Sequence, residues 1–159
     1  MSGTAPLVTL RDLVDRNARF HAETEFLVFG ERRITFAEYA ERAYRLADAL
    51  RTGGLREQER VAVLAMNCPE YLEVYGVGEV APFVITPVNF RLAAPEIRYI
   101  LDDAAPTVLF FESQYAVIVE ALRADLPSLR RFICLDGEPP RWAEAYETVM
   151  ASGSPAGPQ

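Results

Sequence analysis

The sequence predicts an α/β fold, with helices on both faces of a parallel sheet and a β-hairpin ahead of the sheet. Three short apolar runs, at residues 61–65, 83–86 and 107–111, alternate with two longer stretches of helical pattern. Parallel strands need crossovers long enough to hold a helix, so this alternation indicates a parallel sheet covered by helices. Two further apolar runs separated by a glycine near residue 30 predict the hairpin.

Two helices are expected before the sheet, each with a capping box at its start. Thr9 with Asp12 predicts a helix that runs to about residue 21, and Thr35 with Glu38 predicts a longer one. The glycine pair at 53–54 ends the second helix, because glycine adopts the left-handed conformation easily. Arg42 falls on the polar side of this helix, so we expect it to face solvent.

The hairpin is expected at residues 25–35. Its loop is Gly30-Glu31, and glycine at the first loop position favours a type II′ turn, which matches the twist of the strands. We expect Phe26, Val28 and Ile34 to share one face of this hairpin.

Prolines mark where the helices of the sheet region begin. Pro69 opens one helix and Pro95 opens the next, since proline suits the first turn. Asn67 or Cys68 would cap the first of them. Its N-terminus could hold an anion, but no glycine-rich loop precedes it, so capping alone is the favoured interpretation. Glycines at 76 and 78 have low helix propensity and predict close packing against a neighbour.

The rest of the chain predicts three more elements and a tail. They are a helix from Ser113 to about Asp125, a strand at 131–135, a helix at 141–150 and a Gly/Pro/Ser segment at 151–159. The last segment is expected to be a flexible tail or linker. Residues 1–150 would thus form one α/β domain, and a chain that stops in a linker suggests that more once followed.

Composition excludes several classes of function. The formal charge of the 159-residue chain is −7, which argues against nucleic acid as a partner because such binding needs a concentrated positive face. No apolar run is long enough to span a membrane, and the N-terminus has no secretory signal, so a cytoplasmic setting is expected. Every basic side chain is arginine, so this chain holds no P-loop or catalytic lysine.

No metal site is expected. Cys68 and Cys134 stand far apart, without a C-x-x-C motif, and His21 is the only possible nitrogen ligand. Both cysteines are therefore interpreted as small buried apolar groups. The pair Asp102-Asp103 lies at a helix end, with no lysine to complete a phosphorylation site, and is interpreted as a solvated face.

Several motifs together, in order and spacing, resemble the start of an AMP-forming acyl-CoA synthetase, a member of the adenylate-forming superfamily. They are TFAE at 35–38, RVAV at 60–63, NCPEY at 67–71, PVNFRL at 87–92 and PEI at 95–97. The resemblance covers about residues 10–135. It departs from the family at Pro82, where glycine is usual, which should perturb the entry to a strand.

The resemblance implies a two-step ligase that uses ATP, Mg and coenzyme A. A carboxylic acid and ATP would give an acyl-adenylate and pyrophosphate, and coenzyme A would then form the thioester. The family's phosphate loop and catalytic lysine would lie beyond this chain. The fold is therefore expected to be the incomplete N-terminal part of the large domain. Such a piece would be inactive alone, without catalytic residues, and would bind no cofactor tightly. Its partner would be the missing remainder of the enzyme.

The resemblance carries one site residue over to this chain. Arg91 matches a position where some members place an arginine near the coenzyme A nucleotide, and a guanidinium suits phosphate oxygens. The alternative is a surface arginine that is solvated or paired with Glu96. Tyr71, Tyr75 and Phe90 could line an acyl channel, although aromatics at helical spacing are more often core residues.

Two other functions remain open. A non-catalytic interaction or dimerisation module of the same family would keep the fold without the chemistry. A truncated core would leave apolar surface exposed, so a homo-oligomer is expected. A dinucleotide-binding domain would need a G-x-G-x-x-G motif after the first parallel strand, and residues 67–71 offer none.

Overall fold

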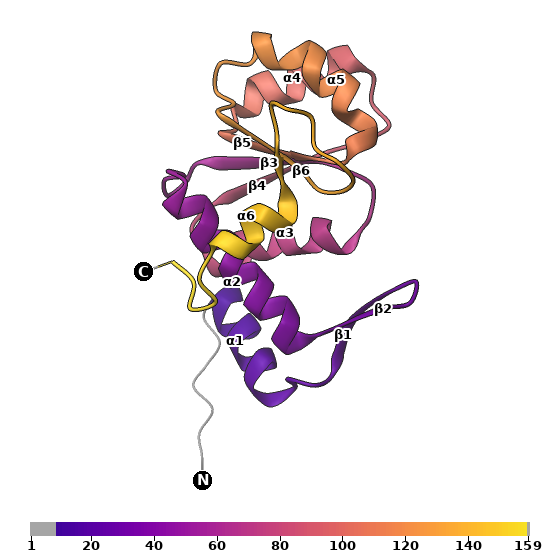
Figure 1. Ribbon diagram of the computed structural model, residues 1–159. Coiled ribbons are helices and arrows are strands. Elements are labelled where there is room, and N and C mark those ends of the chain that lie inside the picture. The colour runs from indigo at the N-terminus through magenta and orange to yellow at the C-terminus, as the bar shows by residue number, and fades with distance from the viewer. Residues whose placement is uncertain (1–8, 159) are drawn as a thin grey trace.

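The computed structural model describes residues 9–158, arranged as a sheet between two helix layers with a hairpin beside them (Figure 1). Residues 1–8 of the expected domain and Gln159 of the expected tail lie outside the described residues. The helices are α1 (Leu10–Phe20), α2 (Phe36–Thr52), α3 (Pro69–Val80), α4 (Ala94–Ala104), α5 (Ala116–Leu122) and α6 (Tyr146–Ser152), with 3-10 turns η1 (Ser113–Tyr115) and η2 (Arg123–Asp125). The strands are β1 (Glu25–Phe29), β2 (Arg32–Thr35), β3 (Arg60–Leu64), β4 (Val84–Val88), β5 (Val108–Phe111), β6 (Arg131–Cys134) and β7 (Glu144–Ala145).

Strands β3 to β7 form one parallel sheet in the order β4-β3-β5-β6-β7. β3 is central: Val61 lies opposite Ile85 of β4 on one side and Val108 of β5 on the other. The chain therefore leaves β3 for β4 through α3, then crosses back over β3 to β5 through α4. Right-handed crossovers in opposite directions place α3 and α4 on opposite faces, as Figure 1 shows. The predicted fold class is confirmed.

Alternate side chains of the strands point into two separate cores. Val61 and Val63 enter the core beneath α1, α2, α3 and α6, here called the α2–α3 layer. Ala62 and Leu64 enter the core beneath α4 and α5, here called the α4–α5 layer. All four side chains are fully buried, as expected for a parallel sheet covered on both faces.

Both predicted capping boxes are present. The Asp12 N–H donates to Thr9 Oγ1 (3.1 Å), and the Thr9 N–H donates to Asp12 Oδ2 (2.8 Å). At α2, the Glu38 N–H donates to Thr35 Oγ1 (3.2 Å), and the Thr35 N–H donates to Glu38 Oε2 (2.8 Å). Each box satisfies two backbone donors that the first helical turn leaves unpaired. α2 ends as expected, with the left-handed residue at Gly54 (φ +95°).

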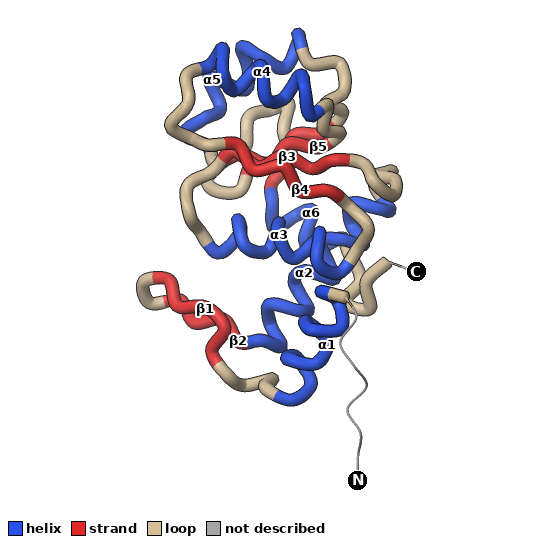
Figure 2. The backbone as a smooth tube through the Cα atoms, turned by 180° about the vertical axis from the view of Figure 1, so that it is seen from behind, coloured by secondary structure: helices blue, strands red, loops and turns tan. Residues whose placement is uncertain are grey.

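The hairpin turns at the predicted residues but faces the core differently. Gly30 has φ +59°, as the first position of a type II′ turn requires. Ile34, however, pairs with Leu27, and the register shifts between Glu25 and Leu27. This shift lets Phe26 and Leu27, although adjacent in sequence, both pack against the core. Val28 pairs with Arg33 and is 51% exposed, so the prediction that it shares a face with Ile34 was wrong. The hairpin extends away from the helix layers (Figure 2).

The two glycines of α3 mark close contacts, as predicted. A Cβ on Gly76 would lie 2.8 Å from the Ala43 Cβ of α2. A Cβ on Gly78 would lie 2.8 Å from Ile85 Cγ1 of β4. These positions let α3 approach both α2 and the strand that follows it.

The C-terminal third differs from the sequence prediction in its boundaries. The helix expected from Ser113 is divided into η1, α5 and η2. The helix expected at 141–150 begins only at Tyr146, because Glu144 and Ala145 pair with β6 as the edge strand β7. A strand of only two residues has too little pattern to be recognised in a sequence.

The segment expected to be a tail contacts α2. α6 continues to Ser152, and the Ser154 N–H donates to Asp48 Oδ2 (2.8 Å). Arg45 Nη1 donates to the Gly153 carbonyl (3.0 Å). That segment 151–159 links this domain to a further region stays a prediction. Between residues 9 and 158, no helix combines the length and apolarity needed to cross a lipid bilayer.

Candidate functional site

The carboxyl edge of the sheet is where a parallel α/β fold collects functional loops. β3 and β5 are neighbours, and their following helices, α3 and α5, leave toward opposite faces. Such a point opens a crevice outside the strand ends, where ligands of α/β proteins commonly bind. In this chain the loops at that crevice are residues 65–68 and 112–114.

The polar groups at the crevice bond to one another. The carboxylate of Glu112 accepts the Met66 N–H (2.8 Å) and the Gln114 side-chain amide (3.0 Å). The Ser113 N–H donates to Asp136 Oδ1 (2.6 Å). These bonds tie the ends of β3, β5 and β6 together. Across residues 9–158, no group of three or more His, Cys, Asp or Glu side chains is arranged to hold a metal ion.

Arg91 lies at the same edge, in the loop after β4. Its N–H donates to Asn89 Oδ1 (3.0 Å), which shapes the loop, and its guanidinium carbon lies 5.3 Å from the centre of the Phe90 ring. Glu96 is engaged elsewhere, accepting the Ala93 N–H at the start of α4 (2.8 Å). No carboxylate of the described residues forms an ion pair with Arg91, so the guanidinium is exposed and open to a ligand.

A shallow hollow of about 410 Å³ adjoins the Arg91 loop. Leu92, Pro95, Tyr99 and Ile100 give it a mainly apolar lining, which Glu96 completes, and Tyr99 is 72% exposed. An exposed cation beside an apolar hollow suits a ligand that carries phosphate on a less polar body.

The three aromatic residues considered for an acyl channel do not meet. Tyr71 and Tyr75 contact each other, with ring centres 5.2 Å apart, and pack against the core of the α2–α3 layer. Phe90 packs against the core of the α4–α5 layer, on the other side of the sheet. The sheet separates Phe90 from the two tyrosines, so the structure does not bring the three side chains together, and each is partly buried against a core.

The two cysteines are unpaired thiols. Cys134 is buried, as predicted, while Cys68 is half-buried at the N-cap of α3, where its side chain forms no capping bond. Burial raises the pKa of the Cys68 thiol to about 12, so it stays protonated and unreactive at neutral pH. Nearby, the carboxylate of Glu70 in the first turn of α3 is paired with Arg32 (2.7 Å).

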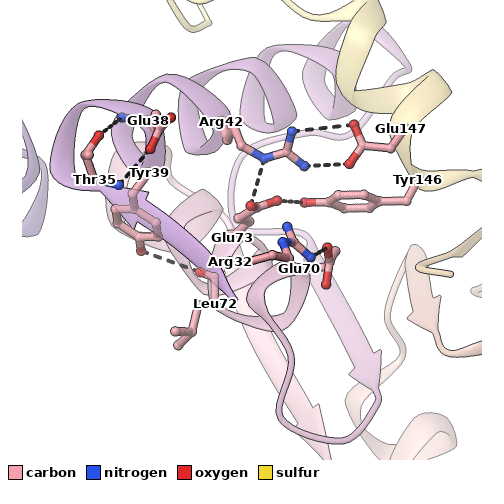
Figure 3. A network of polar contacts seen from close by, with 10 residues as sticks. All are labelled: Arg32, Thr35, Glu38, Tyr39, Arg42, Glu70, Leu72, Glu73, Tyr146 and Glu147. Carbon is pink, nitrogen blue, oxygen red and sulfur yellow. Dashed lines mark hydrogen bonds and ion pairs between the residues drawn. The ribbon is translucent and has the colours of Figure 1, made fainter. Parts of the chain in front are cut away.

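A second polar cluster, which the sequence did not predict, lies inside the α2–α3 layer (Figure 3). Glu73 of α3 is only 1% exposed. Its carboxylate accepts Arg42 Nε of α2 (2.7 Å) and the Tyr146 hydroxyl of α6 (2.5 Å). Arg42 also pairs with Glu147 of α6 (2.7 Å). Three helices thus meet at one buried carboxylate.

The groups of this network bond to one another and hold the three helices together. Burial raises the pKa of Tyr146 well above its ordinary value, and the neighbouring Glu73 adds to the effect. Burial lowers the pKa of Arg42, but its bonds to Glu73 and Glu147 outweigh this, so the net shift is upward. Both donors therefore keep their protons, and Arg42, expected to face solvent, instead lies over α3. The available signal was Glu73 within the otherwise apolar run 72–78, because a glutamate can be buried only with a partner.

Comparison with known proteins identifies the family. The family model described as AMP-binding enzyme matches residues 14–157. A 3-methylmercaptopropionyl-CoA ligase of Ruegeria lacuscaerulensis is 32% identical over 150 residues, which are 92% of this chain and 27% of that protein. A long-chain-fatty-acid–CoA ligase of Thermus thermophilus is 35% identical over 147 residues, 90% of this chain and 27% of the relative.

The fold agrees with the sequence comparison. A crystal structure of a long-chain-fatty-acid CoA ligase of Rhodopseudomonas palustris superposes with a TM-score of 0.89 and 29% identity, covering 96% of this chain and 38% of that one. The chain spans about a quarter of the length of the curated relatives described above. The parallel sheet, its two helix layers and the sequence motifs all agree with this assignment: the chain belongs to the AMP-binding enzyme family, and the relatives described above are acyl-CoA ligases.

Proposed function

We propose that this chain is the N-terminal portion of an AMP-forming acyl-CoA ligase. The observation that carries the proposal is the family match over nearly the whole chain, against ligases of which the chain spans only about a quarter. The complete protein would join a carboxylic acid to coenzyme A at the expense of ATP, with Mg as the metal. A cytoplasmic setting is part of this proposal.

The chain alone is expected to be inactive. It contains no lysine to perform the family's catalytic role. The carboxylates at the crevice, Glu112 and Asp136, accept hydrogen bonds from backbone and side-chain groups of this chain. What the chain offers the complete enzyme is one wall of a site and a rigid support for it. The remaining ligands of ATP and Mg would come from the rest of the protein.

Arg91 is the residue we propose for coenzyme A. It is exposed at the carboxyl edge of the sheet, free of ion pairs among residues 9–158, and stacked near Phe90. A guanidinium in this state can direct two parallel N–H groups at phosphate oxygens. The adjoining apolar hollow would receive the less polar part of the same ligand.

Isothermal titration of the purified chain with coenzyme A and with ATP tests this role. We expect weak binding of coenzyme A that is lost in Arg91→Ala, and no binding of ATP. Arg141→Ala is the matched control, because Arg141 is also an exposed arginine that forms no ion pair with the described residues. Equal binding by the wild-type chain and Arg91→Ala would remove Arg91 from the site without affecting the family assignment.

The alternative function is a non-catalytic interaction or dimerisation module. Large apolar side chains are exposed at Val28 and Phe29 of the hairpin and at Val84 of the edge strand β4. Exposed apolar groups on a projecting hairpin and an unpaired strand edge favour association. Light scattering decides: dimers or larger species would support self-association, and a strict monomer would argue against it.

A further inference from the structure

A pocket of about 380 Å³ lies at the amino edge of the sheet, at the opposite end of the strands from Arg91. Its walls come from the first turn of α1, the end of α2, the loop before β3, the end of α3, the loop before β4 and the segment at 158. Segments from six parts of the chain therefore converge on one concave site.

Three arginines line this pocket: Arg11, Arg51 and Arg56. One carboxylate, Glu57, accompanies them, so the lining carries a net positive charge in a chain of formal charge −7. Neither the Arg51 nor the Arg56 guanidinium forms an ion pair with a carboxylate of the described residues, unlike the half-buried Arg42. Two guanidinium groups are thus available to an anion.

The floor of the pocket is apolar and packed into the core. Leu55, Val80 and Phe83 line it, and each is less than a tenth exposed. The wall at Pro82 is held by the Gln58 N–H, which donates to the Pro82 carbonyl (2.7 Å). Gln58 itself has φ +64°, a conformation that a non-glycine residue adopts only when its surroundings hold it there. The pocket is therefore formed before any ligand arrives.

Pro82 adds an apolar ring to the wall of the pocket. The disturbance of the next strand that was expected from this proline is absent, since β4 keeps a regular register with β3 from Val84 onward. The proline is accommodated in the loop before β4, where it shapes the pocket.

We propose that this pocket binds a small organic oxyanion, with Arg51 and Arg56 on its charged group and its apolar body on Leu55 and Phe83. Guanidinium groups pair with carboxylate and with phosphate oxygens alike, so the shared chemistry is an oxyanion on an apolar body. An inorganic anion would leave the floor uncovered and bind less tightly.

A structural role for the arginines makes a different prediction. α2 ends at Thr52 and α3 at Val80, so the negative ends of two helix dipoles lie near the pocket, and Arg51 is in the last turn of α2. Compensation of those dipoles alone would make the arginines matter for stability and not for binding.

The test is a titration of the purified chain with phenyl phosphate, benzoate and inorganic phosphate at low ionic strength. We expect at least one aryl anion to bind tenfold or more tightly than inorganic phosphate. The double variant Arg51→Gln/Arg56→Gln should weaken that binding at least tenfold, while Arg141→Gln leaves it unchanged. Binding of phenyl phosphate alone would identify a phosphoryl ligand, and binding of benzoate a carboxylate.

Two outcomes would overturn the proposal. One is that neither aryl anion binds more tightly than inorganic phosphate. The other is that the double variant binds as the wild type does while its melting temperature falls, which is the result that dipole compensation predicts. Coenzyme A titration of the double variant should match the wild type, so this site and the Arg91 site are tested separately.

Discussion

The α2–α3 layer and the α4–α5 layer cover opposite faces of the same sheet but are held there by different interactions. Beneath α4 and α5 the core is built from aliphatic and aromatic side chains, with Trp142 stacked on Phe111 (ring centres 5.4 Å apart). Beneath α2 and α3 an apolar core is supplemented by the buried carboxylate of Glu73 and its partners on α2 and α6.

The two layers use different interactions because they differ in the number of helices that must be positioned against one another. α4 and α5 each lie directly on the sheet, so an apolar face is enough to position them. α2 and α6 must instead be positioned against α3 as well. A buried carboxylate accepts bonds only from correctly placed donors, so it specifies one arrangement of the three helices. The comparison indicates that apolar burial holds a helix layer on the sheet, and that buried polar contacts define how its helices are arranged relative to one another.

The largest loss of stability is expected in the α4–α5 layer, whose core is apolar. Phe111 is fully buried and stacked on Trp142. Phe111→Ala should lower the free energy of unfolding by about 4 kcal/mol, through lost apolar contact and the cavity left behind. Urea denaturation measures this. A loss below about 1 kcal/mol would mean that the α4–α5 layer does not depend on this core.

Glu73→Ala should destabilise the α2–α3 layer by about 3 kcal/mol, because it leaves the half-buried Arg42 and the Tyr146 hydroxyl without their shared partner. Glu147→Ala is the matched control. It removes the exposed partner of the same arginine and should lower the free energy of unfolding by only about 0.5 kcal/mol. Equal losses in the two variants would show that the buried position of Glu73 has no special importance.

Gly76→Ala tests the close approach of α3 to α2. The added methyl group would meet the Ala43 Cβ at 2.8 Å, so the helices must separate. We expect a loss of about 2 kcal/mol, within the range for overpacking, even though alanine favours the helix. Thermal unfolding checks this, and a variant more stable than wild type would show that α2 and α3 have room to adjust.

The smallest effect concerns Tyr146 and its dependence on pH. Tyr146→Phe should lower the free energy of unfolding by about 1 kcal/mol at neutral pH, through loss of the hydroxyl bond to Glu73. A buried tyrosine whose pKa is raised above 10.0 adds stability that is complete below pH 10 and is lost as the pH rises through the raised value.

Other tyrosines of the same layer share this behaviour. Burial also raises the pKa of Tyr44 and of Tyr71 to about 12. Stability of the wild-type chain should therefore fall between about pH 10 and 12, and it should fall less steeply in Tyr146→Phe. Urea denaturation at a series of alkaline pH values measures both slopes, and identical slopes would show that Tyr146 does not contribute.

Local patterns predicted the elements, and the reason is visible in the residues. The capping pairs Thr9–Asp12 and Thr35–Glu38, the proline at 69 and the glycines at 76 and 78 each act within a few residues of their position. Short apolar runs separated by helices leave few topologies other than a parallel sheet. The sequence therefore determined the fold class before any contact was known.

Long-range pairing could not be predicted in the same way. The Glu73 network joins residues 42, 73 and 146, and the local sequence around each of them does not indicate the other two. The strand β7 exists only because β6 offers it an edge. Arg91 was identified through resemblance to a family, while the arginine pocket comes from segments distant in sequence and needed the structure.

The most direct test of the central claim is a pyrophosphate-release assay with ATP and mixed carboxylic acids. It should be run on this chain and on the full product of its continuous reading frame. We predict release by the longer protein and none by the chain alone, since the chain has no lysine and is proposed to be only the first part of the ligase. Release by the chain alone, or by neither protein, would contradict the account.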